Sequence, residues 1–360
     1  MIERSDFPAS EYLDHRARVG GEKQLWENNG WSIRGRDGDT DYLFWSSPYL
    51  VHGVAGASYR PGSFALDQTL FVEAPAGAEA ELGDNDFIAI GWDARDQYDW
   101  SQVAVTAETD AVPDAVVWTT PHRSYRAAPP TFGITGTHAG VEADLRIDLD
   151  AEPMWFTDPA EGLDVRANRW WIASGSASGA LVLPGRRVAV RDAHAVHERH
   201  IHLGLVHDPV RLLAGGGVCW YTASGDGLSV ALLARPSLGS AWAQVTLGDR
   251  TWDVTGDGLS LRTTRTWHDP QTNMLVAQAW EVVVDLPDGA GTIELALQAT
   301  ARAYYTWDFL AEGQTMLYWW LCTGTADVRQ GGARRRIPDL LAEAHLNRTF
   351  SVRHDGSRRG

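Results

Sequence analysis

The sequence predicts an all-β protein built from two antiparallel β-barrels in tandem. Short runs of β-branched and aromatic residues recur along most of the chain. Turns that contain Gly, Asp or Pro separate these runs about every 8 to 12 residues, the spacing typical of barrels and sandwiches. The sequence shows neither a strand–helix–strand alternation nor a glycine-rich phosphate loop, which argues against nucleotide-binding folds.

The predicted strands form two series. The first covers residues 41–60, 62–74, 86–94, 101–109, 115–120, 131–137 and 140–151. The second covers residues 179–193, 218–224, 228–234, 241–255, 259–267, 275–287 and 292–305. Residues 151–169 are rich in Pro, Asp and Ala and interrupt the strand pattern. We therefore predict one barrel over residues 1–155 and a second over 165–350, because each half has enough strands to close without exposed edges.

Helix signals are confined to two short segments. One is DPVRLL, residues 208–213, and the other is IPDLLAEAHLN, residues 337–347. Pro338 followed by Asp339 is typical of a helix start. The sequence therefore predicts a short C-terminal helix before the basic tail.

The composition excludes several classes of function. The chain has 360 residues and a net charge of −16, which disfavours nucleic acid and anionic membranes as partners because both attract basic patches. Lys23 is the only lysine and lies in a polar stretch, so Schiff-base and pyridoxal-phosphate chemistry is excluded. Cys219 and Cys322 lie in apolar runs, as core cysteines do, and give no disulfide framework.

The N-terminal residues lack the basic and apolar layout of a signal peptide, and no apolar run is long enough to insert into a membrane. We expect a cytoplasmic monomer or homodimer. The 17 tryptophans supply flat apolar surface that suits β-barrel cores and pockets for apolar or conjugated ligands. The candidates for substrate binding are Trp45, Trp92, Trp100, Trp171, Trp220, Tyr305, Trp307 and Trp320.

A histidine-rich segment, RDAHAVHERHIHLGLVHD at residues 191–208, holds the largest group of candidate catalytic or metal-binding side chains. In a strand, side chains alternate between faces, so Glu198, His200 and His202 share one face and His197 faces the other way. His200 and His202 could contribute to a metal site, but no HExxH or comparable spacing supplies a third ligand. Alternatively, the histidines have a purely structural role and form hydrogen bonds in a polar layer between the barrels.

An acid is the more favoured interpretation of this segment. Protonation of an alkene or enol ether requires a carboxylic acid that an apolar pocket keeps protonated near neutral pH. Glu198 with the adjacent His197 is the first candidate, followed by Asp192 and His200. Asp308 is a second candidate acid because it lies among the aromatic residues of AYYTWDFL.

One linear pattern resembles a known family. In NRWWIASGSASGALVLPGRRVAVRDAHAVHERHIHLG, residues 168–204, an aromatic pair precedes a Ser/Gly-rich stretch, a β-branched strand and a His-Glu step. This order is similar to the opening of the second domain in the hydroxyneurosporene synthase (carotenoid 1,2-hydratase) family. The family's Trp-Gly ending is replaced here by His200 to Gly204, and its small-Gly position by Ala193 or Ala195.

The resemblance implies two lipocalin-like barrels in tandem. Members of the family include isoprenoid hydratases, kievitone-hydratase-type enzymes and cyclases that assist Diels–Alder reactions. It further implies a hydratase or cyclase that needs no cofactor and acts on a terpenoid- or polyketide-like molecule in an aromatic pocket between or within the barrels. Two alternatives remain, a non-catalytic carrier of an apolar ligand and a metal-dependent enzyme that uses His200 and His202.

Overall fold

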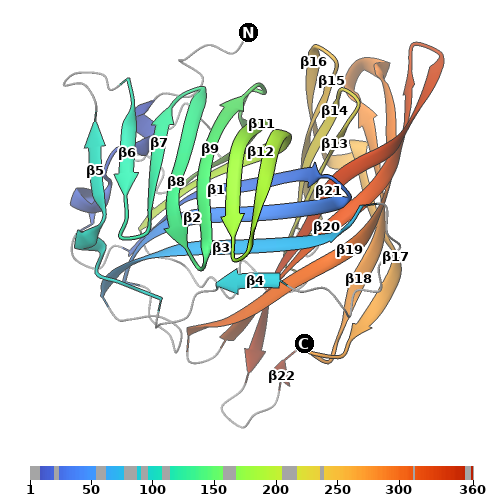
Figure 1. The fold of residues 1–360 in the computed structure, drawn as a ribbon. Coiled ribbons are helices and arrows are strands. Elements are labelled where there is room, and N and C mark those ends of the chain that lie inside the picture. Colours follow the sequence, from blue (N-terminus) through green and yellow to red (C-terminus); the bar gives the residue numbers. More distant parts are fainter. Residues whose placement is uncertain are drawn as a thin grey trace.

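The fold consists of two curled antiparallel sheets that lie side by side, the first coloured blue to yellow-green and the second yellow to red (Figure 1). The computed structural model describes residues 9–19, 24–53, 62–76, 87–90, 96–107, 114–156, 168–204, 217–235, 239–310, 313–352 and 358–359. The prediction of an all-β chain with two lipocalin-like halves is confirmed. No helix in these residues is both long enough and apolar enough to cross a membrane.

The first sheet has the strand order β4-β3-β2-β1-β12-β11-β9-β8-β7-β6-β5, with β10 paired to β11. Its strands are β1 (Gln24–Asp37), β2 (Thr40–His52), β3 (Ser63–Pro75), β4 (Phe87–Ile90), β5 (Ala104–Ala107), β6 (Val116–Thr119), β7 (Arg123–Ala128), β8 (Thr131–His138), β9 (Val141–Leu149), β10 (Met154–Trp155), β11 (Asn168–Leu183) and β12 (Arg186–Gly204). The long hairpin β11–β12 joins β9 on one side to β1 on the other. Residues 168–204 therefore complete the first sheet.

The second sheet has the order β16-β15-β14-β13-β21-β20-β19-β18-β17, with β22 paired to β21. Its strands are β13 (Val218–Gly225), β14 (Leu228–Arg235), β15 (Ser240–Leu247), β16 (Arg250–Thr255), β17 (Leu259–Asp269), β18 (Met274–Leu286), β19 (Gly291–Leu310), β20 (Gly313–Gln330), β21 (Ala333–Val352) and β22 (Arg358–Arg359). The division between the sheets lies between Gly204 and Val218, later in the chain than the boundary predicted at residues 151–169.

The predicted C-terminal helix is wrong. Residues 337–347 belong to β21, which is hydrogen-bonded to β13 and β20 in the middle of the second sheet. Ala342 and Ala344 pack into the core of that sheet, whereas Glu343 and His345 point to its other face. Alternation of this kind requires a strand. The other predicted helix, residues 208–213, lies outside the described residues.

The central strands of each sheet are buried on both faces. One face packs into the core enclosed by that sheet, and the opposite face packs against the other sheet. We call the surface where the two sheets meet the seam. Its apolar side chains form two clusters, and each cluster has residues from both sheets. The first includes Trp45, Leu66, Leu70, Leu317 and Trp319, and the second includes Trp170, Ile172, Val196, Trp220 and Leu233.

A close approach between β9 and β11 predicts a large effect of one methyl group. Gly179 follows a bulge in β11 and has φ +128°, and a Cβ at this position would collide with the Asp144 carbonyl oxygen. We expect Gly179→Ala to lower the free energy of unfolding by about 1–3 kcal/mol, measured by urea denaturation. Gly133→Ala is the matched control, because the nearest atom to its Cβ would be 3.6 Å away. Equal losses in both variants would contradict the explanation.

Candidate active site

From Ala193 to Leu203, strand β12 presents its even-numbered residues to the seam and its odd-numbered residues to the core of the first sheet. Glu198 accepts a hydrogen bond from Trp170 Nε1 at 3.0 Å, and the His200 ring stacks on Trp170 with a centroid distance of 5.2 Å. His197 lies on the opposite face, where its ring stacks on Trp31 at 3.6 Å. The alternation predicted for this segment is therefore present in the structure.

Glu198 is partly buried in the seam and has few polar partners. Besides the bond from Trp170, Oε2 accepts a hydrogen bond from Asn28 Nδ2 at 3.4 Å. Gly30 pairs with Glu198 across β1 and leaves room for it, since a Cβ there would meet the Trp45 ring and lie 3.3 Å from Glu198 Oε2. Burial raises the pKa of Glu198 to about 7, more than the two hydrogen bonds lower it. The group can therefore be protonated at neutral pH.

A small cavity of about 20 Å³ lies beside Glu198 between the two sheets. That volume is large enough for about one water molecule. The residues around it are Ser32, Trp45, Ile172, Val196 and Glu198 from the first sheet, and Trp220, Thr222, Glu343 and His345 from the second. The cavity thus combines aromatic faces with two carboxyl groups.

The second carboxyl group, Glu343, has very different surroundings. Its Oε1 accepts a hydrogen bond from Trp319 Nε1 at 3.1 Å. Its Oε2 accepts a short hydrogen bond from Ser32 Oγ and a longer one from Thr222 Oγ1 at 3.4 Å. The Arg34 guanidinium lies 3.9 Å from the same oxygen. These donors and the cation stabilise a negative charge on Glu343.

Two histidines border this region, and both are neutral. Burial lowers the pKa of His345 to about 3 and that of His200 to about 3. His345 packs edge-on against Trp319, with ring centroids 5.1 Å apart, and faces the cavity. His200 supports Trp170, the residue that donates to Glu198.

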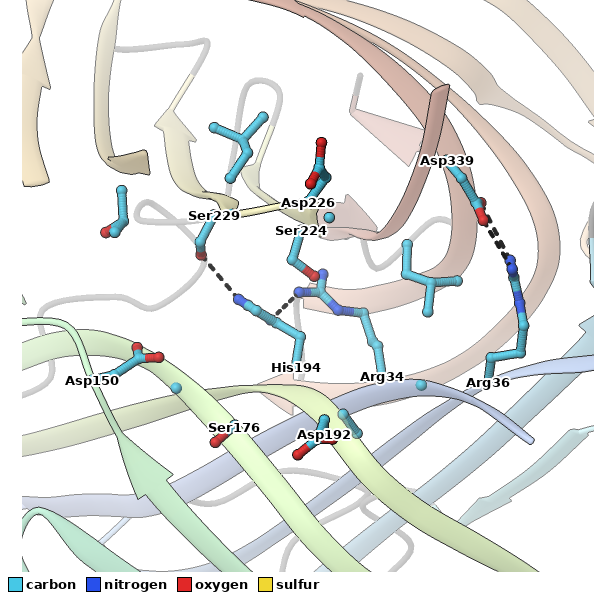
Figure 2. Close-up of a pocket in the computed structure, with 18 of the residues that line it drawn as sticks. Arg34, Arg36, Asp150, Ser176, Asp192, His194, Ser224, Asp226, Ser229 and Asp339 are labelled. Carbon is cyan, nitrogen blue, oxygen red and sulfur yellow. Dashed lines mark hydrogen bonds and ion pairs between the residues drawn. The ribbon is translucent and has the colours of Figure 1, made fainter. Parts of the chain in front are cut away.

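Beyond Arg34 the seam opens into a cleft of about 460 Å³, shown in Figure 2. Its walls include Arg36, Asp192, His194 and the β13–β14 turn around Asp226. Asp192, predicted as a catalytic group, is exposed here with φ +48° and does not line the cavity of Glu198.

The structure does not bring His197 and Glu198 together. His197 Nδ1–H donates to the Gly30 carbonyl at 2.8 Å, and Nε2 accepts from the Tyr12 hydroxyl at 2.9 Å. Burial holds its pKa well below the usual range. Adjacent residues of a strand point to opposite faces, so His197 belongs to the first core and Glu198 to the seam.

The predicted aromatic residues divide among several places. Trp45 and Trp220 line the cavity of Glu198. Trp171 and Trp320 pack in the cores of the two sheets, and Trp100 stacks near His52 in a 3₁₀ turn. Trp92 lies outside the described residues. The backbone of Tyr305, Trp307 and Asp308 belongs to β19, but their side chains also lie outside the described part.

His200 and His202 are neighbours on the seam face, with ring centroids 6.4 Å apart. Across the described ranges, no three His, Cys, Asp or Glu side chains are grouped in a way that could hold a metal ion.

Glu343, His345, Asn28 and Arg34 are not among the site residues predicted from the sequence. Glu343 and His345 fall within the predicted helix, although AEAH alternates small and polar residues with a period of two.

Removal of the Trp170 hydrogen bond provides a test of the acid's environment. This bond stabilises the ionised form of Glu198 and lowers its pKa. We therefore expect Trp170→Phe to raise the pKa of Glu198 above 7, measured by carbon-13 NMR of labelled glutamate. Trp171→Phe is the matched control, because Trp171 faces the first core. A lower pKa in Trp170→Phe would contradict the assigned hydrogen bond.

Comparison with known proteins gives similarity in structure alone. The chain matches no protein-family model and no curated protein sequence. The structure of CghA, solved also with Sch210972, aligns with a TM-score of 0.61 and 11% identity over 95% of this chain and 93% of CghA.

A Nitrosomonas europaea protein that carries the provisional name AttH aligns with a TM-score of 0.52 and 13% identity, over 93% of this chain and 96% of that one. Kievitone hydratase from Nectria haematococca aligns with a TM-score of 0.48 and 9% identity, over 89% of both chains. The chain therefore shares the fold of CghA and of the Nitrosomonas europaea protein.

Proposed function

We propose that this protein is an acid-assisted hydratase or cyclase whose reaction takes place in the seam, with Glu198 as the acid. One observation carries the proposal: two carboxyl groups with opposite electrostatic environments line the same cavity between aromatic faces. Glu198 has a pKa of about 7 because it is desolvated, whereas Glu343 is surrounded by donors and Arg34. A pair of carboxyl groups with divergent environments is suited to acid and base roles.

In a hydration, the Glu198 carboxyl donates its proton to one carbon of the alkene. The positive charge that develops on the other carbon is stabilised by the Glu343 carboxylate and by the faces of Trp45 and Trp220. Water then adds to this carbon and returns a proton to Glu198. In a cyclisation, the Glu198 O–H donates a hydrogen bond to a substrate carbonyl, and no proton is transferred overall.

The substrate class follows from the lining of the seam. The cavity beside Glu198 holds about one water molecule, so the reacting end of a substrate enters when the seam side chains move apart. Trp170, Trp220 and Phe156 lie close to one another next to Glu198, with Phe156 and Trp170 centroids 4.7 Å apart. Such surfaces favour an apolar, unsaturated molecule of the terpenoid or polyketide type.

The proposal is tested by incubation of the purified protein with a panel of acyclic terpenoids and polyene polyketides. A product heavier by one water indicates hydration, and a product of unchanged mass with a new retention time indicates cyclisation. Glu198→Gln should give no hydration product, because an amide has no acidic proton, and Glu198→Ala should give neither product. Equal hydration by the wild-type protein and Glu198→Gln, or equal cyclisation by the wild-type protein and Glu198→Ala, would overturn the assignment.

The pH dependence of turnover follows from the pKa of Glu198. A proton donor is active only in its protonated form, and burial raises this pKa to about 7. We expect kcat to be highest below pH 6 and to fall about tenfold per pH unit above about pH 8. A kcat that rises through this range would indicate a general base instead of an acid.

A non-catalytic carrier is the second candidate, and the size of the two spaces favours it. The open cleft holds about 460 Å³, within the range of small-molecule sites, whereas the cavity at Glu198 holds about 20 Å³. A ligand could occupy the cleft without contact to Glu198. Stoichiometric binding without conversion of any compound in the panel would support this function.

A further inference from the structure

The open cleft has Arg34 at its floor and both paired and unpaired charges on its walls. Arg36 pairs with Asp339 at 2.9 Å, as Figure 2 shows, and Asp226 pairs with Arg335 at 2.9 Å. Arg34 is ion-paired with Glu343 at 3.9 Å, but this carboxylate is too distant to accept a hydrogen bond from it, and no other described carboxylate is closer.

Arg34 is completely buried and has unused donors. Its Nη1 donates to the carbonyl oxygen of Thr222 at 2.7 Å and to the Thr222 hydroxyl. Its Nη2 donates to His194 Nδ1. Nε is buried without an acceptor among the described residues. A guanidinium has five N–H donors, so two remain unsatisfied, Nε–H and one hydrogen of Nη2.

His194 orients a further donor at the same place. Burial and the charge of Arg34 hold the pKa of His194 well below its usual range, so its ring is neutral. Because Nδ1 accepts from Arg34, Nε2 carries the proton and donates to Ser229 Oγ at 2.9 Å. Ser229 Oγ then acts as an acceptor, and its O–H can donate into the cleft (Figure 2).

We propose that Arg34 and Ser229, positioned by His194, bind the carboxylate of an otherwise apolar substrate. A buried guanidinium with two unsatisfied N–H groups is costly unless an anion completes its shell. A planar carboxylate fits the guanidinium fork and adds a charge-assisted pair of hydrogen bonds.

The cleft favours a singly charged anion over a phosphate dianion. Asp150 and Asp192 also line it, and neither has an ion-pair partner in the part of the chain that the structure describes. Their negative charge adds repulsion that grows with the charge of the ligand.

The subsite would also determine which atom of the substrate lies next to Glu198, and this step rests on the proposed function. His194, Val196 and Glu198 are successive seam-facing residues of β12. Four residues of strand span about 13 Å, at about 3.3 Å per residue. A carboxylate at Arg34 therefore places an atom about ten bonds along the chain near Glu198. The substrate class is a long-chain unsaturated acid.

Isothermal titration calorimetry with decanoate and 1-decanol tests the subsite without turnover. The two probes have the same chain and differ in charge. We expect the wild-type protein to bind decanoate at least about tenfold more tightly, the effect of a charge-assisted pair. Arg34→Met should remove this preference. Equal affinity for both probes in the wild-type protein, or a preference retained in Arg34→Met, would overturn the proposal.

Ser229→Asp provides a second test if Arg34→Met does not fold, because it places a carboxylate beside His194. We expect decanoate binding to weaken at least about tenfold and decanol binding to stay within about twofold. Thr246→Asp, on the neighbouring strand opposite Ser229, is the matched control and should weaken decanoate less. Equal losses in both Asp variants would indicate a general charge effect and contradict the subsite.

Two further measurements separate this inference from the function it builds on. Glu198→Gln should retain the preference for decanoate, because it leaves Arg34 in place. If Glu198→Gln abolishes turnover but the wild-type protein shows no carboxylate preference, the subsite is wrong and the acid assignment stands. Inorganic phosphate should compete poorly with decanoate, and equal competition would exclude the apolar acid as the ligand.

Discussion

Glu198→Gln is expected to lower kcat by about 10²–10⁴-fold, the contribution of a positioned general acid. Glutamine keeps the size of the side chain and an oxygen that accepts from Trp170, but it cannot donate an acidic proton. Substrate affinity is expected to stay within about twofold, because the uncharged amide resembles the protonated acid. The measurement is single-turnover kinetics on a substrate identified from the panel.

Asp308→Asn is the comparison variant for this result. Asp308 is the other acid that the sequence suggested, and its backbone belongs to β19. Asp308→Asn should retain turnover within about twofold. Loss of turnover in Asp308→Asn with full activity in Glu198→Gln would move the acid to Asp308.

Arg199→Met is expected to cause the largest loss of stability, about 3–5 kcal/mol, because it leaves a buried carboxylate without its guanidinium partner. Arg199 and Glu27 form an ion pair in the first core, and both side chains are fully buried. Arg199 Nη1 also donates to the Asn28 carbonyl at 2.8 Å, and Nη2 donates to the Glu11 carbonyl at 2.7 Å. His15 Nδ1 contacts Glu27 Oε1 at 2.9 Å and remains the partner of this carboxylate in Arg199→Met.

Urea denaturation at two pH values distinguishes the ion pair from simple packing. Burial alone would raise the pKa of Glu27, and the charges of Arg199 and His15 hold it below the usual range. Without Arg199 the carboxyl protonates more readily, so the loss in Arg199→Met should be smaller at pH 4 than at pH 7. Arg262→Met, which breaks an exposed pair with Glu281, should cost less than about 1 kcal/mol. A loss in Arg199→Met that does not change with pH would indicate packing alone.

The strand content and the tandem arrangement could be predicted because both follow from local patterns. Side chains of the segment HERHIHL, residues 197–203, lie on alternate faces as predicted. The division between the sheets could not be located in this way. Asn168–Gly204 follows the Pro- and Asp-rich segment and therefore resembles the start of a new barrel, but its hairpin pairs with β1 and β9 of the first sheet. Pairing between strands that are distant in the sequence cannot be predicted from local sequence patterns.

The candidate site was only half predictable for a related reason. Glu198 stood out because it lies in a run of histidines, but Glu343 comes from a distant strand whose Leu, Ala and Glu residues also favour a helix. Pro338 and Asp339 are also typical of a helix start. In the structure Asp339 lies at the cleft and pairs with Arg36. In this segment the pairing of β21 with two neighbours outweighs helix propensity.

The two faces of β12 can evolve separately. Even-numbered residues from His194 to His202 face the seam, and odd-numbered residues from Ala193 to Leu203 hold the first sheet together. Substitutions at even positions therefore alter the seam and leave the first core unchanged. A one-residue insertion would exchange the two sets of residues and disrupt both the seam and the first core. Descendants of this chain can thus vary the seam by substitution while the length of this strand stays fixed.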